Sequence, residues 1–412
     1  MSNRLGHRSV AKSHRSVRAV AAVAAFACAV VPAVVWGAPA GSVPQHAIVA
    51  TSTPNGEANT TLSSVSCVTA TTCFAVGASG DVGSGNVANG GTIANLLTTT
   101  FAGRWNGKTF TTLPTPNPLG ATSPVMVGVS CTSATNCFAV GDSLPNLYTA
   151  LVERWNGKTW SIVPSPKPDD VTLNGVSCTS TTFCLAVGTA VEQWNGNTWS
   201  IIASPSPPGQ PYELEGVSCA SRSDCAAVGY FSSPIDGEWL PWFENWNGKR
   251  WSSVDIPDPA GPDPQLSDVS CPSRTTCLAL GNADTGVLSS TVPWTARWNH
   301  NTWSLVSPAD FSARSAALDT LSCTSPANCF AVGSFDSPTS DTHPLVERWN
   351  GKTWSVVAAA ASASATSGLF NGVSCTTSTN CLAVGASVTI NEINQTPLVE
   401  HWNGKNWATV PS

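Results

Sequence analysis

Seven pairs of cysteines, each with five residues between its members, recur along this chain. The first cysteines of successive pairs lie 64, 47, 41, 52, 52 and 52 residues apart. Repeats of about 40 to 50 residues are typical of propeller blades, which bury a core only by packing against their neighbours. The repeat therefore constrains the fold more than any other feature. The pairs are Cys67 and Cys73, Cys131 and Cys137, Cys178 and Cys184, Cys219 and Cys225, Cys271 and Cys277, Cys323 and Cys329, and Cys375 and Cys381.

The cysteine spacing also indicates the chemistry of these residues. Of the 15 cysteines only Cys28, near the N-terminus, lies outside the pairs. An even number in one spacing within an exported chain is typical of disulfides. A zinc site would need ligands two to four residues apart with histidines nearby, whereas His46, His300, His343 and His401 lie in unrelated settings. We expect one disulfide per repeat, no metal site and no cofactor.

Each repeat predicts four short β-strands. The first ends at the first cysteine, and the second begins at the second cysteine and runs through Phe-Ala-Val-Gly, as at 138–141. The third reads Leu-Val-Glu-Arg-Trp at 151–155, and an Asn-Gly dipeptide then supplies the positive φ angles of a tight hairpin turn. The fourth, Thr-Trp-Ser-x-Val, ends at prolines, which cannot donate to a neighbouring strand.

Four antiparallel strands repeated seven times, with no sustained helical period, predict an all-β fold: a seven-bladed β-propeller over residues 62–412. A linear solenoid and a string of independent modules are the alternatives, but each unit is too small to bury a core alone, and a closed ring protects its edges. Residues 47–54 look like a surplus fourth strand, while the last repeat has its own at 406–411. Either copy could complete the ring.

The first 40 residues have the layout of a secretory signal peptide. Five basic residues and no acidic one precede an apolar run from Ala19 to about Trp36. Ala38-Pro39-Ala40 then provides the small residues that a signal peptidase recognises. The run is close to the roughly 20 residues that span a bilayer, so a retained anchor is the alternative. We expect a signal peptide at 1–40, an N-terminal segment with an extra blade strand at 41–61, and an extracellular product.

The charge of the mature chain limits its partners. Beyond the leader it carries 14 basic and 25 acidic residues, a net charge of −11. Such a surface repels phosphate backbones, so we expect no nucleic-acid binding. We also expect no membrane association after signal cleavage, and a monomer.

The hairpin Trp-Asn-Gly-Lys-Thr-Trp at 155–160 resembles the Asp-box turn of sialidase-type propellers, in which an acidic residue precedes Gly-x-Thr-Trp. It has Asn for Asp and one residue fewer before the glycine. The repeat length and the tryptophan near a strand end are also similar to kelch-type propellers, although the paired glycines of kelch strands are missing. The chain thus resembles secreted bacterial-type propeller repeat proteins, which implies the architecture rather than an activity.

Residues that recur in every repeat are interpreted as structural. All of the aromatic positions flanking the Asn-Gly turn hold tryptophan except Phe110, and a residue shared by every blade usually packs it against the next. A glutamate precedes the first tryptophan by two in five repeats, and we expect it to pair with the turn lysine. The glutamates are Glu153, Glu192, Glu244, Glu347 and Glu400, and the lysines are Lys158, Lys249, Lys352 and Lys405.

Function is expected where the repeats differ. The loops between second and third strands, and the linkers between repeats, vary in length and emerge on one face, where binding residues usually lie. Aromatic and acidic residues outside the repeat pattern gather in the loop of the fourth repeat and the strand of the next. They predict a site that stacks on and hydrogen-bonds a sugar, or else a hydrophobic cap. The candidates are Tyr230, Asp236, Glu238, Trp239, Trp242 and Trp294.

The chain has no Gly-x-Ser-x-Gly, His-Glu-x-x-His or phosphate-binding loop, so no catalytic residue is assigned. We expect a secreted, non-enzymatic propeller that binds a glycan or a cell-surface protein. A glycoside hydrolase or lyase on a sialidase-like propeller is one alternative, and a purely structural envelope protein is another. The hydrolase needs two carboxyl groups about 5 Å apart or a tyrosine nucleophile, and the only tyrosines are Tyr148, Tyr212 and Tyr230.

Overall fold

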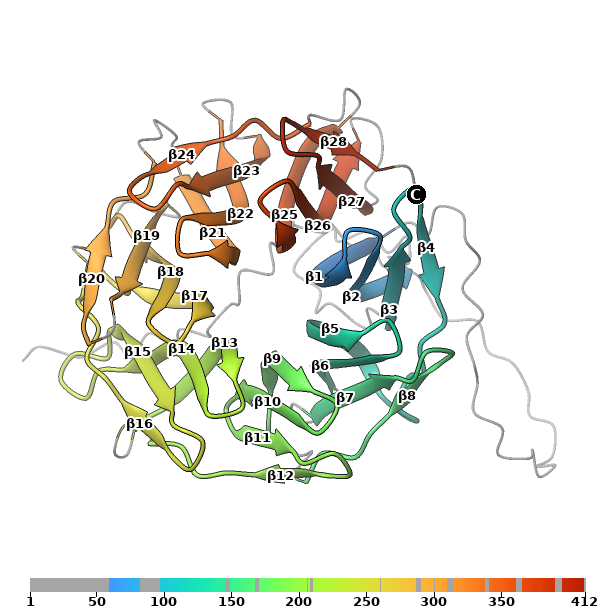
Figure 1. The fold of residues 1–412 in the computed structure, drawn as a ribbon, viewed down its shortest axis with the longest axis horizontal. Helices are drawn as coiled ribbons and strands as arrows, with labels where there is room; N and C mark the ends of the chain where they lie inside the picture. Colours follow the sequence, from blue (N-terminus) through green and yellow to red (C-terminus); the bar gives the residue numbers. More distant parts are fainter. Residues whose placement is uncertain are drawn as a thin grey trace, which may run out of the picture. The chain divides into compact units, whose positions relative to one another are not determined.

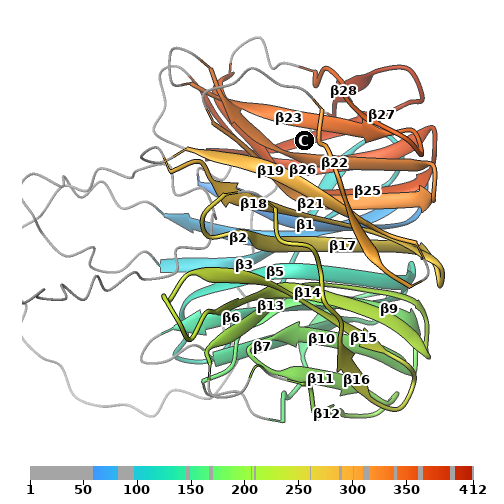
Figure 2. The same cartoon turned by 90° about the vertical axis from the view of Figure 1, so that its left-hand side faces the viewer.

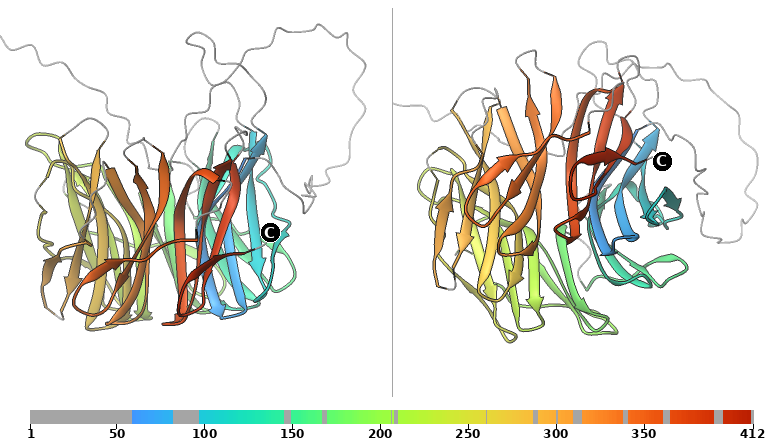
Figure 3. Two further views of the ribbon diagram at one scale, coloured as in Figure 1. Left: turned by 90° about the horizontal axis from the view of Figure 1, so that it is seen from above. Right: turned by 45° about the horizontal axis from the view of Figure 1, so that its top comes forward.

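A computed structural model describes most of the repeat region, and every regular element in the described residues is a β-strand. The strands form seven four-stranded antiparallel sheets around a central axis (Figure 1). Figures 2 and 3 show the same sheets from the side, with strands running between two faces of the ring. The described residues are 59–81, 97–144, 149–166, 170–205, 207, 210–259, 261–286, 290–299, 301–309, 315–337, 341–360, 365–389 and 395–410.

Each blade is built from four consecutive strands, which we call A to D from the axis outward. The seven-bladed prediction is confirmed. Blades 1 to 4 contain β1 (Thr60–Thr69), β2 (Thr72–Asp81), β3 (Leu97–Trp105) and β4 (Phe110–Leu113); β5 (Thr122–Ser133), β6 (Asn136–Leu144), β7 (Thr149–Trp155) and β8 (Trp160–Ile162); β9 (Leu173–Ser180), β10 (Phe183–Gly188), β11 (Val191–Trp194) and β12 (Trp199–Ile201); and β13 (Tyr212–Ser221), β14 (Asp224–Ser232), β15 (Trp239–Trp246) and β16 (Trp251–Ser253).

Blades 5 to 7 repeat the same order. They contain β17 (Gln265–Ser273), β18 (Thr276–Asp284), β19 (Thr291–Trp298) and β20 (Trp303–Val306); β21 (Ser315–Ser325), β22 (Asn328–Asp336), β23 (Thr342–Trp349) and β24 (Trp354–Val356); and β25 (Ala365–Thr377), β26 (Asn380–Thr389), β27 (Gln395–Trp402) and β28 (Trp407–Thr409).

All seven predicted disulfides are present, each joining strand A to strand B within one blade. In blade 2, Cys131 lies opposite Cys137, and the strands continue beyond the bridge to the pair Ser133 and Asn136. The sequence pattern ended strand A at the cysteine. The observed strand is longer because the ladder extends into a tight turn of only two residues.

The glycine that ends the Phe-Ala-Val-Gly motif is required by a close approach between strands. At Gly141 a β-carbon would lie 2.0 Å from the carbonyl oxygen of Val125 on strand A. Immediately beside it, the A–B register shifts between Met126 and Gly128, a β-bulge that increases the local twist. The equivalent shift occurs in the other blades.

The hydrophobic core lies between blades. In β6, Phe138 and Val140 pack against blade 3, whereas Cys137 and Ala139 pack against blade 1. Both faces of the strand are therefore buried. This explains why strand B is a continuous apolar run rather than an alternating one, as in any sheet covered on both sides.

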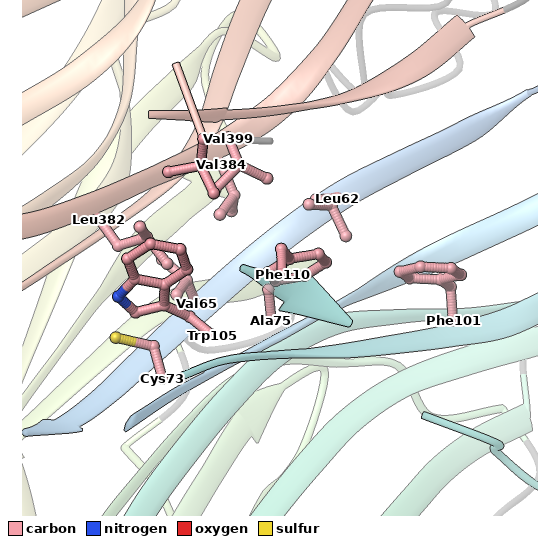
Figure 4. Close-up of a cluster of buried hydrophobic side chains, with 11 residues drawn as sticks. Leu62, Val65, Cys73, Ala75, Phe101, Trp105, Phe110, Leu382, Val384 and Val399 are labelled. Atoms are coloured by element: carbon pink, nitrogen blue, oxygen red, sulfur yellow. The ribbon is translucent and has the colours of Figure 1, made fainter. Parts of the chain in front are cut away.

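The ring closes by packing blade 7 against blade 1. Figure 4 shows Leu62, Trp105 and Phe110 of blade 1 in one cluster with Leu382 and Val399 of blade 7. A chain of hydrogen bonds also runs around the ring, since in each blade the N–H of the first cysteine donates to a serine hydroxyl of the preceding blade. The serines, in blade order, are Ser374, Ser66, Ser130, Ser177, Ser218, Ser270 and Ser322.

The bond between blades 1 and 7 bears on how the ring is completed. The N–H of Cys67 donates to Ser374 Oγ at 2.9 Å, and the N–H of Asn59 donates to the carbonyl oxygen of Gln395 at 2.7 Å. Blade 7 already contains its own strand D, β28, and blade 1 its own, β4. Each blade is thus complete without a strand from the other terminus. The surplus strand predicted at 47–54 lies outside the described residues.

Candidate functional site

The two faces of the ring differ in construction. The A–B and C–D turns lie together on one face, which we call the turn face: a β-carbon on Gly157 of a C–D turn would contact the Thr135 side chain of an A–B turn at 2.8 Å. The B–C loops and D–A linkers lie on the other face, which we call the loop face. Strand direction fixes this arrangement, so length differences between repeats fall on the loop face.

The tryptophans beside each C–D turn are structural, as predicted. Trp155 donates its indole N–H to the carbonyl oxygen of Ala134 in the A–B turn at 3.0 Å, and its ring packs against Trp160 with centroids 5.8 Å apart. Equivalent pairs recur in blades 3 to 7. Aromatic pairs at this separation stabilise beyond their buried area, so these rings secure the turns.

The expected pairing of the repeated glutamates with turn lysines is wrong. All five glutamates are fully buried, whereas the lysines are exposed. The glutamates instead face the linker that follows the preceding blade: Glu192 accepts from Ser165 Oγ at 2.7 Å, and Glu400 accepts from the N–H of Ala360 at 2.8 Å. Burial raises the pKa of Glu400 to about 7 and that of Glu153 to about 8. Four of the five, Glu192, Glu244, Glu347 and Glu400, thus fasten linkers between blades, whereas both carboxyl oxygens of Glu153 have no hydrogen-bond partner within the described residues.

The candidate loop of the fourth repeat is an ordered β-hairpin. Strands β14 and β15 pair up to Ser232 and Trp239, and the turn closes by a 2.7 Å bond from the N–H of Ser233 to the carbonyl oxygen of Glu238. Asp236 and Glu238 are exposed at its tip, and Ile235 between them and the strand is 92% exposed. Sequence reasoning had overlooked this isoleucine. We call residues 233–238 the hairpin tip.

The aromatic candidates sit at the base of this hairpin and are only partly accessible. Trp239 is half-buried, edge-on to Tyr230 with ring centroids 5.0 Å apart. Trp242 is half-buried and donates its indole N–H to the buried Glu244 at 2.8 Å. Trp294 is 5% exposed within the hydrophobic cluster between blades 4 and 5. Trp294 therefore has no exposed ring face for a ligand and does not form a site with the hairpin tip.

Tyr230 belongs to a polar cluster between blades 3 and 4 that the sequence pattern did not reveal. Its hydroxyl donates to Glu213 at 3.2 Å, and the same carboxylate accepts from Thr172 and Asn174 of blade 3. Burial, and then the charges of Glu215 and Glu213, raise the pKa of Tyr230. The phenol is therefore held neutral, which disfavours the phenolate that a tyrosine nucleophile requires.

Within the described residues, no group of three or more His, Cys, Asp or Glu side chains is placed to hold a metal ion. That part of the chain also has no helix long and apolar enough to cross a membrane.

Comparisons with known proteins support the architecture. No protein-family model matches the chain, and neither does any curated protein. Among solved structures, the propeller domain of the Trilobed protease from Pyrococcus furiosus, described as having an open velcro topology, is 9% identical with a TM-score of 0.52 over 87% of this chain and 99% of its own. YCF48 bound to D1 peptide is 12% identical with a TM-score of 0.51 over 84% of this chain and 92% of its own. The chain is a seven-bladed β-propeller with one disulfide in each blade.

Proposed function

We propose that this protein is a secreted, non-enzymatic propeller that binds a protein partner at the cell surface through its loop face. The observation that carries the proposal is the hairpin tip, which presents an isoleucine 92% exposed beside two exposed carboxylates on a hydrogen-bonded support. A partner that covers this side chain removes apolar surface from water, which favours binding. Secretion fits seven disulfides, which persist in oxidising compartments.

A protein partner fits this tip better than a sugar. Sugar stacking needs an open aromatic face, whereas Trp239 and Trp242 are both half-buried, with Tyr230 packed against the first and Phe231 against the second. An isoleucine followed by Asp236 and Glu238 in the same turn instead matches an apolar pocket with basic residues at its rim. The propeller YCF48 was solved with a bound D1 peptide, so a peptide ligand is compatible with the fold.

The proposal of a non-enzymatic role rests on the burial of the carboxyl and phenol groups that could otherwise act in catalysis. The repeated glutamates, which as carboxylic acids are candidates for acid–base catalysis, are fully buried between blades, out of reach of a polymeric substrate. Tyr230 is kept neutral by burial and by two neighbouring carboxylates. Neither group has the accessibility that acid–base or nucleophilic catalysis needs.

The test is a parallel screen of a glycan array and of immobilised peptides that combine apolar and basic residues. The Ile235→Ser variant should lose at least about fivefold in affinity for the peptides bound by the wild type, since burying this side chain contributes on the order of 1 kcal/mol or more. Leu119→Ser is the matched control, because Leu119 is 96% exposed on a different linker of the loop face. Equal losses in both variants would argue against the hairpin.

The other outcomes are also informative. Binding to a glycan, abolished by Trp239→Ala but not by Ile235→Ser, would replace the protein partner with a sugar. Turnover of a chromogenic glycoside or unsaturated-product release from a polysaccharide would contradict a non-enzymatic role.

A further inference from the structure

The turn face carries the exposed positive charge of the described chain. In five blades the residue after Asn-Gly is a lysine, and two A–B turns and one further C–D position carry arginines. All of these side chains are exposed, and they lie on the face opposite the hairpin tip. They are Lys108, Lys158, Arg222, Lys249, Arg250, Arg274, Lys352 and Lys405; we call them the basic ring.

Negative charge is sparse on this face. Among the described residues, the acidic residue on the turn face is Asp224. It lies in an A–B turn, is half-buried, and has Arg274 Nε 3.2 Å from its Oδ2. The exposed carboxylates of the described residues lie on the loop face instead: Asp170, Asp236, Glu238, Asp255, Asp258, Asp284 and Asp341. A protein of net negative charge thus presents a locally positive surface on one side.

The lysines are not needed to form the turns in which they occur. In blade 2 the side-chain oxygen of Asn156 accepts from the backbone N–H groups of Lys158 and Thr159, and Gly157 supplies a φ of 95°. Blade 3 makes the same turn with Asn197 at the lysine position, with its N–H 2.9 Å from Asn195 Oδ1. The lysine side chain is therefore available for another purpose.

The five turn lysines also have no side-chain partner among the described residues. The glutamates once expected to pair with them are buried between blades, and no side-chain bond or ion pair is made by the five turn lysines within the described residues. Exposed cations repeated at equivalent positions around a rigid ring suit a ligand that also repeats its charges, since several weak contacts then act together.

We infer that the basic ring binds an anionic polysaccharide, one bearing carboxylate, sulfate or phosphate groups. The turns between the cations expose asparagine and threonine side chains, which hydrogen-bond sugar hydroxyls, and they contain no large apolar side chain to insert into a bilayer. The loop face would then hold a protein while the turn face adheres to a polymer, and the two activities are separable because they use opposite faces.

The test measures binding of the purified disulfide-bonded protein to immobilised polygalacturonate and dextran sulfate, with unsubstituted dextran as the neutral control. The variant replaces the five lysines by asparagine, the residue that blade 3 already has: Lys108→Asn, Lys158→Asn, Lys249→Asn, Lys352→Asn and Lys405→Asn. With each exposed ion pair contributing about twofold, the loss should be roughly 30-fold, and wild-type binding should weaken as salt rises. Unchanged melting of the variant shows that the loss is not unfolding.

Two double variants, each changing the net charge by two units, show whether binding depends on the turn face or only on the net charge of the protein. Lys249→Asn with Lys352→Asn removes two positive charges from the turn face, and Asp236→Asn with Glu238→Gln removes two negative charges from the loop face. The first should weaken binding about fourfold, and the second should leave it nearly unchanged. Equal and opposite changes, no binding to either polyanion at low salt, or stronger binding to anionic vesicles or DNA than to the polysaccharides would each overturn the inference.

Discussion

Replacing the buried Glu400 by glutamine should stabilise the protein at pH 8. This side chain is fully buried; one oxygen accepts from the N–H of Ala360 at 2.8 Å, and the other has no hydrogen-bond partner within the described residues. Glutamine keeps the acceptor and removes the charge. Because a buried carboxylate without an ion-pair partner is costly, its loss should be favourable whenever the glutamate would ionise.

The magnitude follows from proton linkage. Burial raises the pKa of Glu400 from 4.5 to about 7, so between these values the native state holds more protons than the unfolded chain. The stabilising contribution of the protonated form is complete below pH 4.5 and is lost as pH rises through about 7. The wild type should therefore lose about 2 kcal/mol between pH 5 and pH 8 from this group alone, and Glu400→Gln should not.

The assay is urea unfolding with disulfides intact, at pH 5 and pH 8, for wild type, Glu400→Gln and Lys405→Asn. The difference between Glu400→Gln and wild type should favour the variant by about 2 kcal/mol more at pH 8 than at pH 5, while Lys405→Asn should stay within about 0.5 kcal/mol of wild type. If Glu400 instead paired with Lys405, both variants would be destabilised at pH 8. That result would refute the buried arrangement.

Three further outcomes are expected. Ser374→Ala should cost about 1 kcal/mol and speed hydrogen exchange of the Cys67 amide, whose bond closes the ring; unchanged exchange there would contradict the closure. Gly157→Ala should lower the melting temperature more than Gly237→Ala. Both glycines have a positive φ, which should destabilise either alanine variant by about 1–2 kcal/mol, but only at position 157 would the added β-carbon also contact a neighbouring side chain. Mass spectrometry of protein exported by a bacterial host should show that residues 1–40 are removed, whereas a membrane-bound, full-length product would indicate a retained anchor.

The sequence was sufficient for the architecture because the fold repeats. Seven copies of a cysteine pair, with an Asn-Gly turn in six repeats and a tryptophan pair in six, specify blades, and the structure places them as expected, with each disulfide inside its blade. The expectation that the repeated glutamates pair with turn lysines was wrong. Because side chains alternate along a strand, a Glu two residues before a Trp lies on the same face as that Trp, and packing between blades buries Glu153 and its equivalents in a seam.

The candidate site could be predicted from the sequence only in part. Aromatic residues outside the repeat indicated a loop of interest, but their burial depends on other strands and blades. Trp294 fills the seam between blades 4 and 5, and Tyr230 donates to Glu213 on strand A of its own blade, a carboxylate that also accepts from Asn174 of blade 3. Ile235 was overlooked because a single apolar residue in a polar loop is unremarkable. Its significance comes from the hydrogen-bonded turn that holds it in solvent.

The most direct test of the account compares the two faces for one ligand. For the tightest peptide found in the screen, calorimetry should give a Kd at least about fivefold weaker for Ile235→Ser than for wild type, with the five-lysine variant unchanged. A peptide affinity that falls in the lysine variant and persists in Ile235→Ser would place recognition on the turn face and contradict the proposed role of the loop face.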